Sequence, residues 1–173
     1  MEITNLTTGI KNYEFIVASL PEYYRTELQN LREHYSLEKI GKHLLTRDRT
    51  YFERVAKHEE KTRRVLLALE DANLEGVLES SICKEGRFQI ANILWVLARK
   101  KGKGVGTLLI RHYLNEVKES CNIVALSVSK TNSNAARLYE RLEFKYTCNR
   151  PDDPTMKVYT FNLSSQKEKI DKG

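Results

Sequence analysis

Residues 94–108 read LWVLARKKGKGVGTL, a short apolar segment that runs directly into a basic, glycine-rich one. The pattern predicts a buried strand at 94–98, a turn through the glycines and a helix that begins near Val105. Glycine lacks a Cβ, so the backbone turns sharply there, its N–H groups converge, and the positive end of the helix dipole adds to them. Such a turn suits a diphosphate. A solvated turn whose lysines serve solubility is an equal alternative on the local sequence alone.

Two other phosphate loops fit this turn poorly. A P-loop needs G-x-x-x-x-G-K-[ST], and the chain has no such run. A dinucleotide-binding loop needs G-x-G-x-x-G, but Thr107 stands where the third glycine belongs. The next predicted strand, 123–128, is followed by Ser129 and Lys130, without the acid that holds a ribose hydroxyl. The sequence therefore disfavours a nicotinamide-dependent enzyme.

The overall composition predicts one basic domain. The chain has 173 residues, of which 40% are hydrophobic, and this suits a single core of ordinary size. We expect one domain over residues 1–163, followed by a flexible, charged tail at 164–173. The formal net charge of +6 favours acidic ligands such as phosphorylated cofactors, nucleic acid or acidic protein surfaces, although excess lysine also serves solubility alone.

Cysteines, histidines and the N-terminus carry no signal for a metal, for disulfides or for export. The three cysteines are scattered and lack C-x-x-C spacing, and the four histidines are isolated. We therefore expect no metal site and a cytoplasmic location. No basic segment followed by an apolar run opens the chain, and no apolar stretch approaches the roughly 18 residues of a membrane span.

Apolar spacing and turn residues predict a strand, then helices, three strands in a meander, a helix, a strand, a helix and two strands. The first strand is expected at 13–18, with Ser19 capping a helix that has Pro21 near its start. The other helices are expected at 37–45, after Thr50, at 105–118 and at 133–142. The other strands are expected at 65–69, 74–83, 89–96 and 123–128, with one before the last, which is expected at 156–163.

Two motifs in this order resemble those of the GNAT superfamily of N-acetyltransferases. That family's [QR]-x-x-G-x-[GA] falls on 101–106, KGKGVG, and its N-x-x-A-x-x-[LF]-Y-x-x-x-G-F falls on 132–144, NSNAARLYERLEF. The resemblance covers most of residues 65–163. It implies an α+β fold with a central, twisted, mostly antiparallel sheet of about seven strands flanked by helices. It also implies that coenzyme A (CoA) lies in the splay between strands 4 and 5.

The resemblance implies acetyl-CoA as cosubstrate, an amine as acceptor and no metal. The pantetheine arm would pair with the strand at 94–96, and the diphosphate would be held by the turn. Asn132 would form a hydrogen bond with the pantetheine, although an asparagine before a helix is more often an N-cap. Tyr139 would protonate the departing thiolate. The residues implied for binding are Leu94, Trp95, Val96, Lys101, Gly102, Lys103, Gly104, Val105, Gly106, Thr107 and Asn132, and Tyr139 is the implied catalytic residue.

The implied reaction is direct attack of a neutral primary amine on the thioester, with the oxyanion met by a strand N–H. An alkyl amine has a pKa of about 10.4, so it must first lose a proton. Relatives that modify ribosomal protein N-termini often carry a glutamate five positions before the motif asparagine, where this chain has Ser127. The remaining candidates for the base are Glu79, Glu75, Asp71 and a chain of water molecules.

The chain departs from the family pattern at two positions. Lys101 replaces the usual arginine or glutamine, which keeps the charge and loses the planar fork. Glu143 replaces the glycine before Phe144, at a left-handed helix end where a side chain costs roughly 1–2 kcal/mol. Neither change removes a group that the chemistry needs.

Two other functions stay open. One is a catalytically weak CoA-binding sensor or interaction protein. The less favoured one is nucleic-acid binding through the basic residues Arg63, Arg64, Arg99, Lys100, Lys101 and Lys103.

The resemblance implies that the acceptor, a protein or peptide amine or a small metabolite amine, is selected by residues 21–61 and 145–163. The positive charge disfavours a polycation. Tyr23, Tyr24, Tyr35 and Tyr51 are candidates to line the acceptor cleft, and a homodimer is left open.

Overall fold

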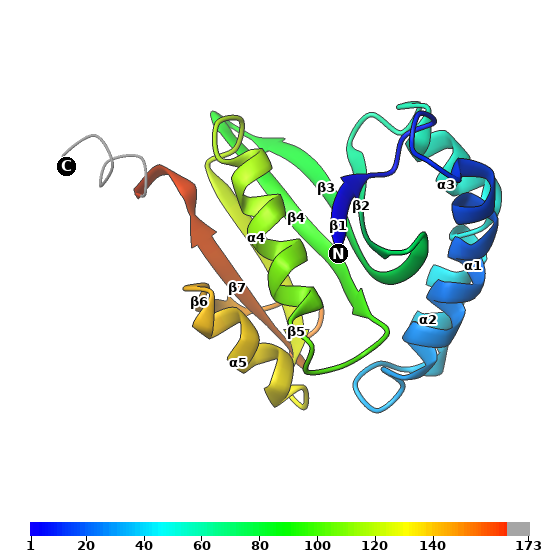
Figure 1. The fold of residues 1–173 in the computed structure, drawn as a ribbon. Coiled ribbons are helices and arrows are strands. Elements are labelled where there is room, and N and C mark those ends of the chain that lie inside the picture. The colour runs from blue at the N-terminus through cyan, green and yellow to red at the C-terminus, as the bar shows by residue number, and fades with distance from the viewer. Residues whose placement is uncertain (166–173) are drawn as a thin grey trace.

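A twisted sheet runs through the molecule in the strand order β1-β2-β3-β4-β5-β7-β6 (Figure 1). The computed structural model describes residues 1–165, so most of the predicted tail at 164–173 lies outside the described residues. Every neighbouring pair is antiparallel except β4 and β5, which are parallel. This confirms the expected sheet. The strands are β1 (Glu2–Asn5), β2 (Arg63–Glu70), β3 (Asn73–Glu85), β4 (Phe88–Ala98), β5 (Ile123–Ser129), β6 (Lys145–Asn149) and β7 (Met156–Asn162).

Helices cover both faces of the sheet, and each face has its own apolar core. Helices α4 (Val105–Val117) and α5 (Ser133–Arg141) pack on one face, and α1 (Tyr13–Gln29), α2 (Leu37–Thr46) and α3 (Arg49–Ala56) pack on the other. Neighbouring residues of β2 point to opposite cores, since Leu66 faces α4 and Leu67 faces α1. The sheet is therefore buried on both sides at its centre.

The predicted first strand at 13–18 is wrong, because these residues begin α1. Ile16, Val17, Leu20 and Tyr24 are buried at helical spacing, so the apolar run is one stripe of an amphipathic helix. Pro21 lies inside the helix, and the Ser19 hydroxyl donates to the Ile16 carbonyl at 2.9 Å instead of capping it. The actual first strand is β1, which pairs with β2. The other predicted helices and strands are confirmed, with small shifts at their ends.

Gly76 on β3 determines how closely α4 approaches the sheet. A Cβ at this position would lie 2.5 Å from Val105 Cγ1 and 3.0 Å from Leu109 Cδ1. Real Cβ atoms do not approach so closely, so a larger residue would push α4 outward. The glycine thereby places the beginning of α4, and with it the preceding turn, close to the end of β4.

Candidate active site

Strands β4 and β5 separate halfway along their length. They pair only from Ile90 opposite Ile123 to Ile93 opposite Leu126. At that point β4 has a bulge, because Glu79 and Ser80 of β3 face Trp95 and Ile93, which leaves Leu94 as an extra residue. Beyond the bulge, β4 keeps β3 as its neighbour and has no pairing with β5. The backbone edge of residues 94–96 is therefore open toward β5, as predicted for an added strand.

The basic turn lies directly at the end of this open edge. Gly102 and Gly104 have φ values of +75° and +78°, and Gly104 is the N-cap of α4. An added Cβ at either glycine would meet nothing within 4 Å, so their backbone conformation, not space, requires glycine. At Gly106, by contrast, a Cβ would touch Val96 and Leu138 at 3.5 Å, between β4 and α5. The turn thus presents a helix N-terminus next to the splay.

The N–H groups of this turn are available for an anion. The first N–H group in the chain that donates within α4 is that of Leu108, which donates to the Gly104 carbonyl at 3.0 Å. The preceding N–H groups belong to the first helical turn, which has no internal acceptors. The exposed cations Arg99, Lys100, Lys101 and Lys103 lie just before or within this turn.

Asn132 is the N-cap of α5. Its Oδ1 accepts from the Ala135 N–H at 3.2 Å, as its position before a helix predicts. The cap occupies the carbonyl oxygen and leaves the two amide hydrogens of Nδ2 for a ligand. The connection between α1 and α2 reaches the same place, since His34 Nδ1 lies 2.8 Å from Thr131 Oγ1.

Tyr139 lies on α5 with 9% of its surface exposed, packed edge-on against Phe144 at a centroid distance of 5.9 Å. Burial raises the pKa of its phenol well above the usual value of 10, and the nearby Tyr35 raises it further. The phenol is therefore protonated at neutral pH. No described residue forms a hydrogen bond with its hydroxyl, so the proton is not committed to a neighbour.

The C-terminal end of α5 fixes where Tyr139 stands. The Phe144 N–H donates to the Tyr139 carbonyl at 3.0 Å, and the Glu143 N–H donates to the Glu140 carbonyl at 3.0 Å. This is a Schellman motif, which needs a left-handed residue at its end. Glu143 supplies it with a φ of +69°, as predicted, although it is not glycine. The strain is therefore present in the folded chain.

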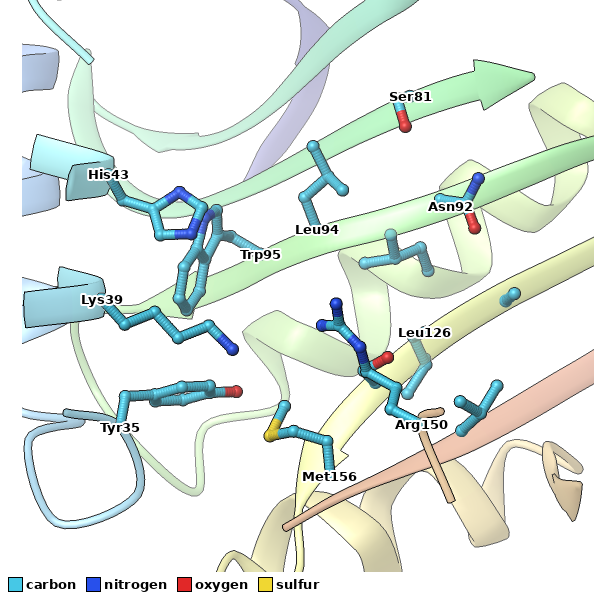
Figure 2. A pocket seen from close by; sticks show the side chains of 14 residues that line it. Tyr35, Lys39, His43, Ser81, Asn92, Leu94, Trp95, Leu126, Arg150 and Met156 are labelled. Atoms are coloured by element: carbon cyan, nitrogen blue, oxygen red, sulfur yellow. The ribbon is translucent and has the colours of Figure 1, made fainter. Parts of the chain in front are cut away.

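A pocket of about 400 Å³ opens on the α2 side of the splay (Figure 2). Lys39 and His43 line it from α2, one helical turn apart, and Tyr35, two residues before the helix begins, continues the same four-residue spacing. Trp95 of β4 forms part of its wall, and Arg150, which follows β6, reaches in from the other side. Both segments that the family resemblance assigned to the acceptor thus contribute to the pocket.

Of the four candidate tyrosines, Tyr35 lines the pocket and the other three do not. Tyr23 and Tyr24 belong to α1 and point into the core, and the Tyr51 hydroxyl donates to Glu79. Sequence spacing alone did not separate these roles, because all four tyrosines lie on or beside amphipathic helices.

The charged groups of the pocket are Lys39, Arg150 and the titratable His43. Burial lowers the pKa of His43, and repulsion from Arg47 lowers it further, so the imidazole is neutral at pH 7. Its ring lies 5.0 Å from that of Trp95, edge to face. No prediction placed His43 here, although its spacing from Tyr35 and Lys39 was a usable signal.

None of the three acids named as candidate bases lines this pocket. Glu79 is fully buried and accepts from Arg47 Nε at 2.8 Å, from Arg47 Nη2 at 3.1 Å and from the Tyr51 hydroxyl. Its oxygens are thus occupied, and the ion pair joins the end of α2 to β3. Glu75 lies 4.0 Å from Lys100, and Asp71 is in the turn between β2 and β3.

The basic residues named for nucleic-acid binding fall into two separate groups. Arg63 and Arg64 begin β2, whereas the cations of the turn follow the end of β4. Strands β2 and β4 both run antiparallel to β3, so these groups lie at opposite ends of the sheet. The two groups therefore do not form the one continuous patch that the hypothesis needs.

The described residues contain neither a helix that could span a membrane nor a cluster of metal ligands. No described helix is long and apolar enough to cross a membrane. Residues 1–165 also contain no group of three or more histidine, cysteine or acidic side chains placed to hold a metal ion.

Residues 27–144 match the model of the Acetyltransferase (GNAT) family. No curated protein matches the chain by sequence. The fold is similar to that of the PaiA N-acetyltransferase from Thermoplasma acidophilum, solved in complex with coenzyme A. The TM-score is 0.69 at 18% identity, and the match covers 94% of this chain and 99% of that chain.

Two further acetyltransferase structures show the same fold. A probable acetyltransferase from Staphylococcus epidermidis has a TM-score of 0.69 at 12% identity, over 93% of this chain and 98% of that chain. An aminoglycoside 6′-acetyltransferase type Ii has a TM-score of 0.63 at 13% identity, over 94% and 97%. At such identities the likeness concerns the fold alone.

Proposed function

The chain belongs to the acetyltransferase (GNAT) family of acyl-CoA N-acyltransferases, and from this premise we propose that it transfers the acetyl group of acetyl-CoA to a primary amine by direct attack. One observation carries the proposal. The open backbone edge of β4 at 94–96 continues into a turn of left-handed glycines at the beginning of α4. These elements suit the two parts of CoA, an amide-containing arm and a diphosphate.

The residues proposed for the cofactor fit its chemistry. The carbonyl and N–H groups of Leu94 and Val96 are of the kind that pairs with the pantetheine amides, and Asn132 Nδ2 adds a donor. The N–H groups of residues 102–107 and the side chain of Thr107 suit the diphosphate, with Lys101 and Lys103 as exposed counter-charges. Lysine in place of arginine at position 101 acts as a point charge.

Tyr139 is the proposed proton donor to the departing thiolate. Its phenol is protonated at neutral pH, is buried and is not bonded to a described residue. A backbone N–H of the open β4 edge is the proposed partner of the oxyanion that forms when the amine attacks the thioester. A positioned proton donor typically accelerates such a step by about 10²–10⁴-fold.

Among the described residues that line the pocket, none carries a carboxylate that could deprotonate the amine. We infer that the amine arrives neutral or loses its proton through water. The neutral imidazole of His43, in the pocket wall, is available to accept that proton. The rate is then expected to rise with pH until the amine itself is neutral, because only the unprotonated amine attacks. A plateau reached near pH 5 would instead indicate a dedicated acid of low pKa.

The test is an assay of thiol release from acetyl-CoA with a panel of primary amines, coupled to mass spectrometry of the products. The proposal expects thiol and acetylated amine in equal amounts. The alternative, a CoA-binding sensor without catalysis, expects CoA to raise the melting temperature while no amine in the panel releases thiol.

A further inference from the structure

Two cations face each other across the acceptor pocket. Figure 2 shows Lys39 extending from α2 and Arg150 entering from the segment between β6 and β7, with their charged ends toward the same space. Lys39 Nζ lies 5.0 Å over the Tyr35 ring. Among the described residues that line the pocket, none is aspartate or glutamate. The wall is therefore positive at one end and otherwise neutral.

Arg150 is held so that one edge of its guanidinium stays free. Its Nε donates to Asp152 at 2.8 Å and its Nη2 donates to the same carboxylate at 2.6 Å. Its backbone N–H donates to the Met156 carbonyl at 2.9 Å. The end-on fork, made of Nη1 and the second hydrogen of Nη2, has no hydrogen-bond partner among residues 1–165, and this edge matches a carboxylate in geometry and charge.

The acids near these cations lie outside the cavity. Asp152 has 67% of its side chain exposed, against 34% for Arg150, and Asp153 accepts from the N–H and hydroxyl of Thr155. Burial lowers the pKa of Lys39, repulsion from Arg150 lowers it further, and Asp153 and Asp152 oppose this only in part. An anion between Lys39 and Arg150 would relieve this repulsion, whereas a second amine would increase it.

We propose that the acceptor is a small amine that also carries a carboxylate, as an amino acid does, with the carboxylate bound by Arg150 and Lys39. This rests on the proposed acetyl transfer and adds the substrate class. Leu94, at the bulge, lines the same cavity as Arg150, so one small molecule can place its carboxylate at the cations and its amine at the open edge of β4. The volume of about 400 Å³ is that of a small-molecule site.

The experiment compares each of the common amino acids with its own carboxamide, and with a simple diamine, in the thiol-release assay. The proposal expects kcat/KM to be at least about tenfold higher for an amino acid than for its amide, as for loss of one charged hydrogen-bond partner. The amide has the less basic amine and so more of the neutral form at a given pH. A preference for the acid must therefore come from binding. A preference for the amides or the diamine would overturn the proposal.

The variant Arg150→Gln tests whether Arg150 causes the preference for an amino acid over its amide. This variant is expected to lower kcat/KM for the preferred amino acid by about 10- to 100-fold and for its amide by less than about threefold, with CoA affinity unchanged. Arg87→Gln, an exposed arginine in the turn between β3 and β4, is the matched control and is expected to have no effect. An equal loss for the acid and the amide in Arg150→Gln would show a merely structural role and contradict the proposal.

A second readout keeps the carboxylate site testable if no amine is turned over. The amino acids, added to the CoA-bound protein, are expected to raise its melting temperature in the wild type and not in Arg150→Gln. Such a shift without turnover would reject the proposed acetyl transfer and retain the anion site. The absence of both shift and turnover would reject the anion site.

Discussion

The two sides of the β4–β5 splay present different kinds of chemical group. On the side of α4 and α5, the proposed cofactor site consists mainly of backbone atoms from one continuous segment, residues 94–107. On the side of α2, the pocket consists of side chains from distant segments, among them Lys39, Trp95 and Arg150. The cofactor site depends on glycine conformation and helix geometry. The pocket depends on how separate elements meet, so substitutions in its side chains can change its chemistry without changing the fold.

The two sides also differ in how firmly their helices are held. Helix α4 buries Val105, Leu109, Ile110, Tyr113 and Val117 against the sheet. In α2 only Ile40 is buried among the residues of the helix. Its other attachments are the partly buried Leu44, the ring contact of His43 with Trp95, and the ion pair between Arg47, at its end, and Glu79. The helix on the cofactor side thus packs through a wide apolar face, whereas α2 on the acceptor side buries a single residue fully.

The largest effect is expected from Gly104→Asp, which should abolish the rise in melting temperature that CoA produces. The left-handed backbone resists a side chain, and a negative charge would stand against the diphosphate. Gly86→Asp is the matched control, because Gly86 also has a positive φ, +58°, with nothing near its Cβ, and lies in the turn between β3 and β4. An unchanged CoA shift in Gly104→Asp would remove the turn from the cofactor site.

Tyr139→Phe should lower kcat by about tenfold to a thousandfold while CoA affinity stays nearly the same, because the phenol acts when the thiolate leaves. Tyr113→Phe, at a buried tyrosine of α4 in the same core, is the control and should keep its turnover. Steady-state kinetics and a CoA titration of both variants make the comparison. Full activity of Tyr139→Phe would assign Tyr139 to packing alone.

On the acceptor side, Glu79→Gln should lower the free energy of unfolding by about 3 kcal/mol, because Arg47 would remain buried without its counter-charge. Urea unfolding measures this loss. The kcat/KM of the folded enzyme should fall by less than about tenfold, and so should that of Glu75→Gln and Asp71→Asn, because none of these acids lines the pocket. A loss of a thousandfold in any of the three, with the fold and CoA affinity intact, would identify a general base.

The smallest effect is expected from Glu143→Gly, which should change stability by less than about 1 kcal/mol, in the stabilising direction. Glycine relieves the positive φ of +69° but gives the unfolded chain more freedom, so part of the gain cancels. Arg137→Gly, at an exposed position inside α5, should instead destabilise by about 1 kcal/mol. A destabilised Glu143→Gly would mean that the Glu143 side chain makes a contact that outweighs the strain.

The cofactor side could be predicted from the sequence because its determinants are local. Strand, glycine turn and helix follow one another in 94–108, and Asn132 and Tyr139 lie in a second short motif. Their roles toward CoA stay predictions, whereas the elements that carry them are confirmed. At the N-terminus the prediction failed because Glu2–Asn5 holds one apolar residue, Ile3, and because the run at 13–18 suits a strand or a buried helix equally.

The acceptor pocket could not be predicted in the same way. Lys39 and Arg150 are far apart in the chain, and nothing local to either one indicates that they meet. The bulge at Leu94 is also a tertiary feature, set by the registers of β4 with β3 and with β5. Only the four-residue spacing of Tyr35, Lys39 and His43 indicated a shared face, and it did not say what that face opposes.

The most direct test of the central claim is a crystal structure of the chain grown with CoA. The diphosphate is expected within hydrogen-bond distance of the N–H groups of residues 102–107. The pantetheine should pair with the edge of 94–96, and the sulfur should lie beside the Tyr139 hydroxyl. CoA bound elsewhere, for instance in the second cavity, of about 440 Å³, lined by Arg63 and Arg64 at the opposite end of the sheet, would contradict the account.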